Sequence, residues 1–259
     1  MKFENRLLPH SRKRICWIVL IAGLAGFAAL MAAVMACGQT SFDQAALQFF
    51  VSMRQDGLST LMEGITYLGC WEAITILCLL LMLNDRTFLP YGVPLAIAAA
   101  TTSLFRLGIK AVVQRPRPPE ALRMVSEHSY SFPSGHAITS FAVYGLLAVL
   151  LISTQVRLTR AQKAAPPEAG EAEPSERDKN NPFYTALHEK AELKKKHRRY
   201  RIAGAVVCLF LTFAIGLSRL YLGVHWATDV LAGWCFGAAD IAAILIVRDA
   251  LRRKRRAGS

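Results

Sequence analysis

Six long apolar segments constrain the fold of this chain more than any other feature. Four of them carry no charged residue, namely 15–36, 87–105, 137–156 and 202–218. The other two, 58–83 and 226–247, carry only isolated acidic residues. A hydrocarbon core of ~30 Å needs about 20 helical residues, and a spanning backbone must be helical or form a closed barrel. The segments do not alternate between polar and apolar residues, so we predict an all-α bundle of six transmembrane helices.

Composition agrees with a membrane protein and excludes several other classes. Apolar residues make up 53% of the chain and charged residues only 19%, below the ~25% of a typical soluble domain. A disordered chain is excluded because disorder requires low hydrophobicity. The net charge of +13 alone would suit a nucleic-acid binder, but the apolar segments do not, and we predict no nucleic-acid partner. The six Cys residues lack metal-ligand spacing and are interpreted as packing residues.

The distribution of Lys and Arg predicts the orientation of the spans. With six spans both termini lie on one side, and that side holds the basic segments 1–14, 157–200 and 249–259. Only seven of the 31 Lys and Arg residues fall in the opposite connections. Basic connections face the cytoplasm, so we expect a multi-pass cell-membrane protein with cytoplasmic termini. The stretches 37–57, 106–136 and 219–225 are then outside.

Four segments carry further expectations. The first apolar run could instead be a cleaved signal peptide ending near Cys37, although it is long for one. Apolar residues within 42–53 recur at near-helical spacing and predict a short interfacial helix, with an ordinary loop as the alternative. The cytoplasmic insert 157–200 is expected to be disordered over about 161–181, and its basic end, like the C-terminal tail, to attract anionic lipid headgroups. Pro residues near 90 are expected to delay the third span.

Residues suited to catalysis and anion binding gather in three short segments on the predicted outer side. The first reads Lys110-Ala-Val-Val-Gln-Arg-Pro-Arg117-Pro118, and the second reads Pro133-Ser134-Gly135-His136 at the start of the fourth span. The third runs from Ser218-Arg219 through His225 to Asp229. Each stretch alone has an ordinary explanation as an interfacial anchor, a turn or local helix support. Their joint occurrence on one side of the membrane predicts a shared site.

The residue types in these stretches suit a phosphate group. Lys110, Arg117 and Arg219 are cations at the outer ends of different spans, where the charge bias disfavours them. Guanidinium groups bind phosphate oxygens in a bidentate manner, and a lysine adds a point charge. Ser134 and Gly135 open a helix, whose free amides and positive dipole end favour an anion. We therefore predict an anion site built from these five residues.

The two histidines add reactivity to the predicted site. His225 and Asp229 are four residues apart and share a helix face if the sixth helix starts near His225. The carboxylate then fixes the tautomer of the imidazole and leaves its other nitrogen free to attack. His136 comes from another helix and can protonate a leaving oxygen.

These motifs, in this order, resemble those of the type 2 phosphatidic acid phosphatase (PAP2) superfamily. Its signatures Lys-x6-Arg-Pro, Pro-Ser-Gly-His and Ser-Arg-x5-His-x3-Asp are matched without a substitution at Lys110–Pro118, Pro133–His136 and Ser218–Asp229. The resemblance implies the six-span PAP2/haloperoxidase-type bundle. It implies His225 as nucleophile through a phosphohistidine, Asp229 as its support and His136 as general acid. It assigns phosphate binding to Lys110, Arg117, Ser134, Gly135 and Arg219, with no metal or other cofactor.

The resemblance further implies a lipid phosphatase acting at the outer leaflet. Undecaprenyl diphosphate leads the expected substrates for a bacterium, followed by phosphatidic acid, phosphatidylglycerol phosphate and diacylglycerol diphosphate. Three alternatives remain open: a phosphotransferase using the same site, a non-catalytic membrane scaffold or transporter, and a vanadium haloperoxidase, which the six spans oppose. The oligomeric state is not predicted.

Overall fold

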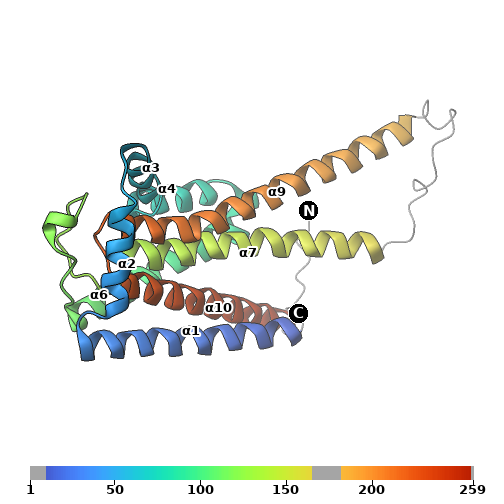
Figure 1. Ribbon diagram of the computed structural model, residues 1–259. Coiled ribbons are helices and arrows are strands. Elements are labelled where there is room, and N and C mark those ends of the chain that lie inside the picture. The colour runs from blue at the N-terminus through green and yellow to red at the C-terminus, as the bar shows by residue number, and fades with distance from the viewer. Residues whose placement is uncertain (1–9, 165–181, 258–259) are drawn as a thin grey trace. The chain divides into compact units, whose positions relative to one another are not determined.

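The computed structural model describes residues 10–164 and 182–257, and every regular element in these ranges is a helix. The long helices are α1 (His10–Cys37), α6 (Val93–Val113), α7 (Gly135–Ala164), α9 (Pro182–Tyr221) and α10 (Ala227–Ala257) (Figure 1). The shorter elements are α2 (Ser41–Ser52), α3 (Asp56–Tyr67), α4 (Trp71–Met82), α5 (Asp85–Thr87), the π-helix η1 (Phe88–Gly92) and the 3₁₀ helix η2 (Glu120–Leu122). The predicted all-α class is confirmed.

Among the residues that the structure describes, five helices are long and apolar enough to cross a membrane, and the bent pair α3 and α4 gives a sixth span if its two helices are counted together. The sequence predicts one continuous helix over 58–83, but α3 and α4 meet at an angle of 51°. Gly69 lies in this break, and a Cβ atom there would approach Ile215 Cγ2 to 2.4 Å. The break therefore brings the backbone close to α9, which only glycine allows.

The start of α6 follows the expectation from its prolines. The segment Phe88–Gly92 forms a π-helix, and Pro94 occupies the first turn of α6. Proline is tolerated there because the first amides of a helix have no carbonyl partner within it. At the other end Gln114 adopts a left-handed conformation with φ of 46°, and Pro116 follows. Because proline cannot continue a helix, α6 ends at Val113, and Lys110 lies in its last turn.

The chain divides into two compact units, and all candidate site residues belong to the first, Met1–Leu146 with Phe210–Ser259. The second unit, Leu147–Leu209, contains the remaining parts of α7 and α9. The expected disorder over 161–181 falls largely on residues 165–181, which lie outside the described residues. Residues 161–164 are the last residues of α7, and α9 begins at Pro182, so the expectation for the segment between these helices stays a prediction.

The core of the first unit forms where α1 packs along α10. A Cβ atom at Gly23 would lie 2.6 Å from the carbonyl oxygen of Cys235, so the two backbones are nearly in contact. Four aromatic rings fill the adjoining space, with Phe105 and Phe236 stacked at a centroid distance of 3.5 Å and Phe27 and Phe132 beside them. The α6–α7 connection is thereby anchored to α1 and α10 through Phe132, three residues before α7 begins.

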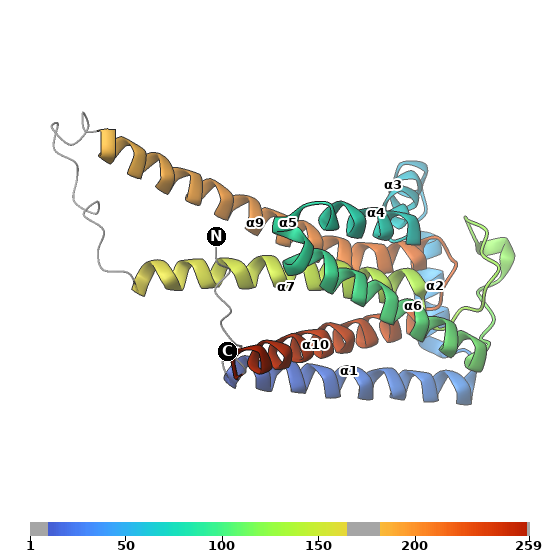
Figure 2. The ribbon, with the colours of Figure 1, turned by 180° about the vertical axis from the view of Figure 1, so that it is seen from behind.

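Helix α2 occupies the predicted interfacial segment and lies at the end of the first unit where the α6–α7 connection also lies (Figures 1 and 2). A capping box fixes its start: Thr40 Oγ1 accepts from the Asp43 amide, and the Asp43 carboxylate accepts from the Thr40 amide. Phe42 and Phe49 are exposed, whereas Phe50 packs into the core. The amphipathic pattern of this helix therefore has a buried and an exposed side.

Candidate active site

The three motifs lie at the ends of four helices, and the third motif connects the end of α9 to the start of α10. Lys110 is in the last turn of α6, His136 in the first turn of α7, Arg219 in the last turn of α9 and Asp229 in the first turn of α10. A Cβ atom at Gly233 would lie 3.0 Å from the amide nitrogen of Ile138, so α10 supports the start of α7 directly. Close helix packing thus positions the motif residues.

His225 lies between a carboxylate and a guanidinium. Its Nδ1 is 3.3 Å from Asp229 Oδ2, and its Nε2 is 3.1 Å from Arg117 Nη1. Helix α10 begins at Ala227, close to the start expected near His225, and the His225–Asp229 pair forms. The Asp229 carboxylate also accepts hydrogen bonds from the Trp226 amide at 2.9 Å and from Ser131 Oγ. The Nδ1–H tautomer fits this arrangement and leaves the Nε2 lone pair on the Arg117 side.

Arg117 and Arg219 converge on the carboxylate of Glu127. Glu127 Oε2 accepts from Arg117 Nη2 at 3.2 Å, and Oε1 accepts from Arg219 Nη2. Arg117 also donates to the carbonyl oxygens of Ser129 and Val224. The Glu127 side chain is 23% exposed, whereas both arginine side chains are nearly buried. The buried guanidinium groups are thus fixed in place, and both bind the partly exposed Glu127 carboxylate.

Lys110 lies beside the same cluster. Its Nζ donates to Ser129 Oγ at 3.0 Å and to the carbonyl oxygen of Tyr130. Arg106, one turn earlier in α6, lies against the second motif: a Cβ atom at Gly135 would approach Arg106 Cδ to 2.7 Å. The absence of a side chain at Gly135 thereby leaves room for the Arg106 side chain. Ser134 is fully buried, and its amide donates to the Asp229 carbonyl oxygen at 3.2 Å.

The positive charges act on both histidines. Arg117, Arg219 and Lys110 interact electrostatically with His136 and with His225, and the two imidazoles interact with each other. Burial, and then the charges of Arg117, Arg219 and Lys110, hold the pKa of His225 well below its ordinary value. Burial, partly offset by Glu127, lowers the pKa of Arg117 to about 10, so it stays charged. All eight predicted site residues therefore belong to one cluster, with a neutral His225 facing charged guanidinium groups.

Five residues of this cluster were missed by the sequence motifs. Arg115 donates to Asp229 Oδ1 at 2.5 Å and to Asp43 Oδ2 at 2.7 Å. Thr228 donates to Asp43 from its amide and its hydroxyl, both at 2.9 Å. Ser131 and Glu127 contact the motif residues as described above. Arg115 and Thr228 lie inside motifs at variable positions, whereas nothing local distinguishes Asp43, Ser131 or Glu127 from cap and loop residues.

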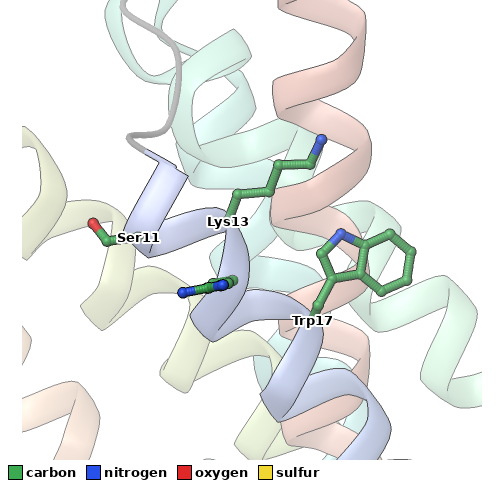
Figure 3. Close-up of a pocket in the computed structure, with 4 residues that line it drawn as sticks. Ser11, Lys13 and Trp17 are labelled. Carbon is green, nitrogen blue, oxygen red and sulfur yellow. The ribbon is translucent and has the colours of Figure 1, made fainter.

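One other feature of the described residues lies apart from this cluster. A surface hollow lies at the start of α1, lined by Ser11, Lys13, Arg14 and Trp17 (Figure 3). Arg115 donates to the Gly38 carbonyl oxygen just after the other end of α1, which is ~40 Å away along a helix of 28 residues. Within residues 10–164 and 182–257, His, Cys, Asp and Glu form no group of three that could hold a metal ion.

Comparisons with known proteins agree with the motifs and the geometry. The PAP2 superfamily model matches residues 87–253, which is more than half of the chain. The chain belongs to the PAP2 superfamily. It is 30% identical over 215 residues to phosphatidylglycerophosphatase B of Bacillus subtilis (strain 168), covering 82% of this chain and 85% of that protein. The enzyme class predicted from the sequence, a membrane phosphatase, is confirmed at this level.

Two solved structures share the fold. The transmembrane PAP2-type phosphatidylglycerolphosphate phosphatase from Bacillus subtilis has a TM-score of 0.63 and 25% identity, with 91% of this chain and 96% of that chain covered. LpxE of Aquifex aeolicus has a TM-score of 0.50 and 18% identity, with 84% and 98% covered, and supports the fold alone. The predicted multi-pass membrane architecture is therefore confirmed.

Proposed function

We propose that the protein hydrolyses the terminal phosphate of a membrane lipid through a phosphohistidine on His225. One observation carries this proposal: the His225 imidazole has Nδ1 on Asp229 at 3.3 Å and Nε2 on Arg117 at 3.1 Å. The nucleophilic nitrogen therefore faces a group suited to a phosphate oxygen, while the opposite nitrogen has a carboxylate to balance developing positive charge.

The reaction proceeds in two displacements. The Nε2 lone pair of His225 forms a bond to phosphorus while the bond from phosphorus to the lipid oxygen breaks, and the departing oxygen takes a proton from His136. A water molecule then attacks phosphorus and gives a proton to His136 as the P–N bond breaks, which releases inorganic phosphate. Asp229 supports the imidazole ring throughout, since its carboxylate is held by the Trp226 amide as well as by His225.

The cations bind the phosphoryl oxygens. Arg117 and Arg219 present adjacent guanidinium groups, and Lys110 adds a third charge. The Gly135 amide and the Ser134 hydroxyl lie at the start of α7, where the helix dipole favours an anion. Preorganised donors of this kind stabilise the charge that develops during phosphoryl transfer, so this chemistry requires no metal ion.

Phosphatidylglycerol phosphate is the substrate to test first. The relative that is 30% identical carries the name phosphatidylglycerophosphatase B, which favours this lipid over undecaprenyl diphosphate, the first expectation from the sequence. Undecaprenyl diphosphate and phosphatidic acid belong in the same panel because the cluster itself recognises only a phosphate. The distribution of Lys and Arg supports a site at the outer face with both termini in the cytoplasm and basic segments on anionic headgroups.

The decisive experiment measures phosphate release by purified protein in detergent over this lipid panel. His225→Ala should abolish release, whereas His128→Ala should not, because His128 is exposed on the same α6–α7 connection. Retained turnover in His225→Ala with normal folding would remove the nucleophile assignment. Labelled substrate distinguishes inorganic phosphate from a phosphorylated acceptor and so separates a hydrolase from a phosphotransferase.

A further inference from the structure

A row of three buried charges links α2 to the catalytic pair. Asp43 and Asp229 have no exposed surface, and Arg115 between them is 3% exposed. Arg115 Nη2 contacts Asp43 Oδ2 at 2.7 Å, and Arg115 Nη1 contacts Asp229 Oδ1 at 2.5 Å. Because Asp229 contacts His225, the row ends on the ring that acts as nucleophile in the proposed function.

Further hydrogen bonds fix the positions of the Asp43 and Arg115 side chains. Thr228 donates its amide and its hydroxyl to Asp43, and the Thr40 amide donates to the same carboxylate at 3.1 Å. Arg115 also donates to the Gly38 carbonyl oxygen at 3.0 Å and to Thr228 Oγ1 at 2.8 Å. Burial acts against the charged form of Asp43, but these amides and Arg115 outweigh it and lower the pKa of Asp43. Asp43 is therefore ionised at neutral pH.

The ion pairs of Arg115 determine how much negative charge Asp229 presents to His225. Arg115 lies closer to Asp229 than the imidazole does, at 2.5 Å against 3.3 Å. In a buried site, an Arg115–Asp229 pair alone would be neutral and would cancel most of the field that the carboxylate exerts on the ring. Asp43 adds a second negative charge on the far side of Arg115. The three groups together then carry one net negative charge opposite His225.

We propose that Asp43 is a positioning residue of this active site, which acts through Arg115 to orient Asp229 and to preserve its negative charge toward His225. Asp43 does not touch the substrate. Its removal should therefore lower the rate of the chemical step and leave substrate binding nearly unchanged. This inference rests on the proposed phosphatase function.

The test compares Asp43→Asn with Asp56→Asn in the full-length protein in detergent. Asp56 lies exposed in the first turn of α3 and provides a matched control. For Asp43→Asn we expect kcat to fall about 10- to 100-fold, with KM changed less than about twofold. Asp56→Asn should match the wild type in both constants. Equal kcat values in the two variants would overturn the inference while leaving the proposed function intact.

A charge-balanced double variant separates the electrostatic role from a structural one. Asp43→Asn with Arg115→Gln removes one negative and one positive charge, so Asp229 keeps its own charge for His225. We expect its kcat to exceed that of Asp43→Asn, whereas two structural defects would add and lower it further. If Asp43→Asn does not fold, the double variant is compared with Asp229→Asn, and equal inactivity of two folded proteins overturns the inference. A wild-type protein that releases no phosphate from any lipid phosphate would instead refute the proposed function.

Discussion

Replacing Glu127 by Gln tests how an anion enters the site. The Glu127 carboxylate contacts Arg117 Nη2 at 3.2 Å and also contacts Arg219 Nη2. Both guanidinium groups are proposed phosphate ligands, so the carboxylate occupies donors that an incoming phosphate requires. With 23% of its side chain exposed, Glu127 can move toward solvent, whereas the buried arginines cannot. Phosphate must therefore compete with Glu127 for these donors.

The size of the effect follows from the hydrogen bonds that change. A hydrogen bond between charged groups contributes about 1.5–3 kcal/mol, and one with a neutral partner about 0.5–1.5 kcal/mol. Partial exposure reduces the difference at this site to roughly 1 kcal/mol. Since about 1.4 kcal/mol corresponds to tenfold in affinity, Glu127→Gln should tighten the binding of inorganic phosphate about fivefold.

The assay is competitive inhibition of lipid phosphate hydrolysis by inorganic phosphate in detergent. Glu127→Gln should lower the inhibition constant, whereas Glu120→Gln, an exposed change on the same α6–α7 connection, should not alter it. If Glu127→Gln instead weakens inhibition by phosphate, Glu127 serves to hold the two arginines in place for the ligand, and the competition argument is wrong.

Three further predictions concern metal, pH and packing. EDTA should leave phosphate release intact, because the cations and helix-start amides supply the positive charge; strict metal dependence would refute the mechanism. Because the pKa of His225 lies below 6.5, this group stays neutral as pH falls through 6.5, and kcat should show no loss attributable to it there. Gly233→Val should destabilise the protein by about 1–3 kcal/mol in thermal unfolding, and Gly57→Ala, which meets open space, should not.

The features that could be predicted from the sequence are those that a local pattern encodes. Apolar length identifies the spans, and the motif residues fall at helix ends because Pro and Gly interrupt the helices beside them. The break at Gly69 could not be predicted, since it depends on contact with Ile215 on a distant segment. Within the second span, the local composition alone favours a continuous helix.

The supporting residues of the site were missed for a similar reason. Asp43 forms a complete capping box with Thr40, so the sequence offers a sufficient local explanation for it. Its second role depends on Arg115 and Thr228, which are 72 and 185 residues away in the chain. In the sequence Glu127 resembles any acidic loop residue, and its role depends on contacts with Arg117 and Arg219 that only the folded chain forms. Long-range pairing of this kind leaves no periodic signal.

The pairing of charges also explains how several buried cations are tolerated at one end of the first unit. Arg115 is balanced by Asp43 and Asp229, and Arg117 and Arg219 share Glu127. Among the described residues, Lys110 and Arg106 form no ion pair and interact with Glu127 only at longer range. Uncompensated positive charge is thus concentrated beside the start of α7 and His136. A dianionic phosphate bound there would neutralise that charge, which is why this set of residues favours phosphate over a singly charged ligand.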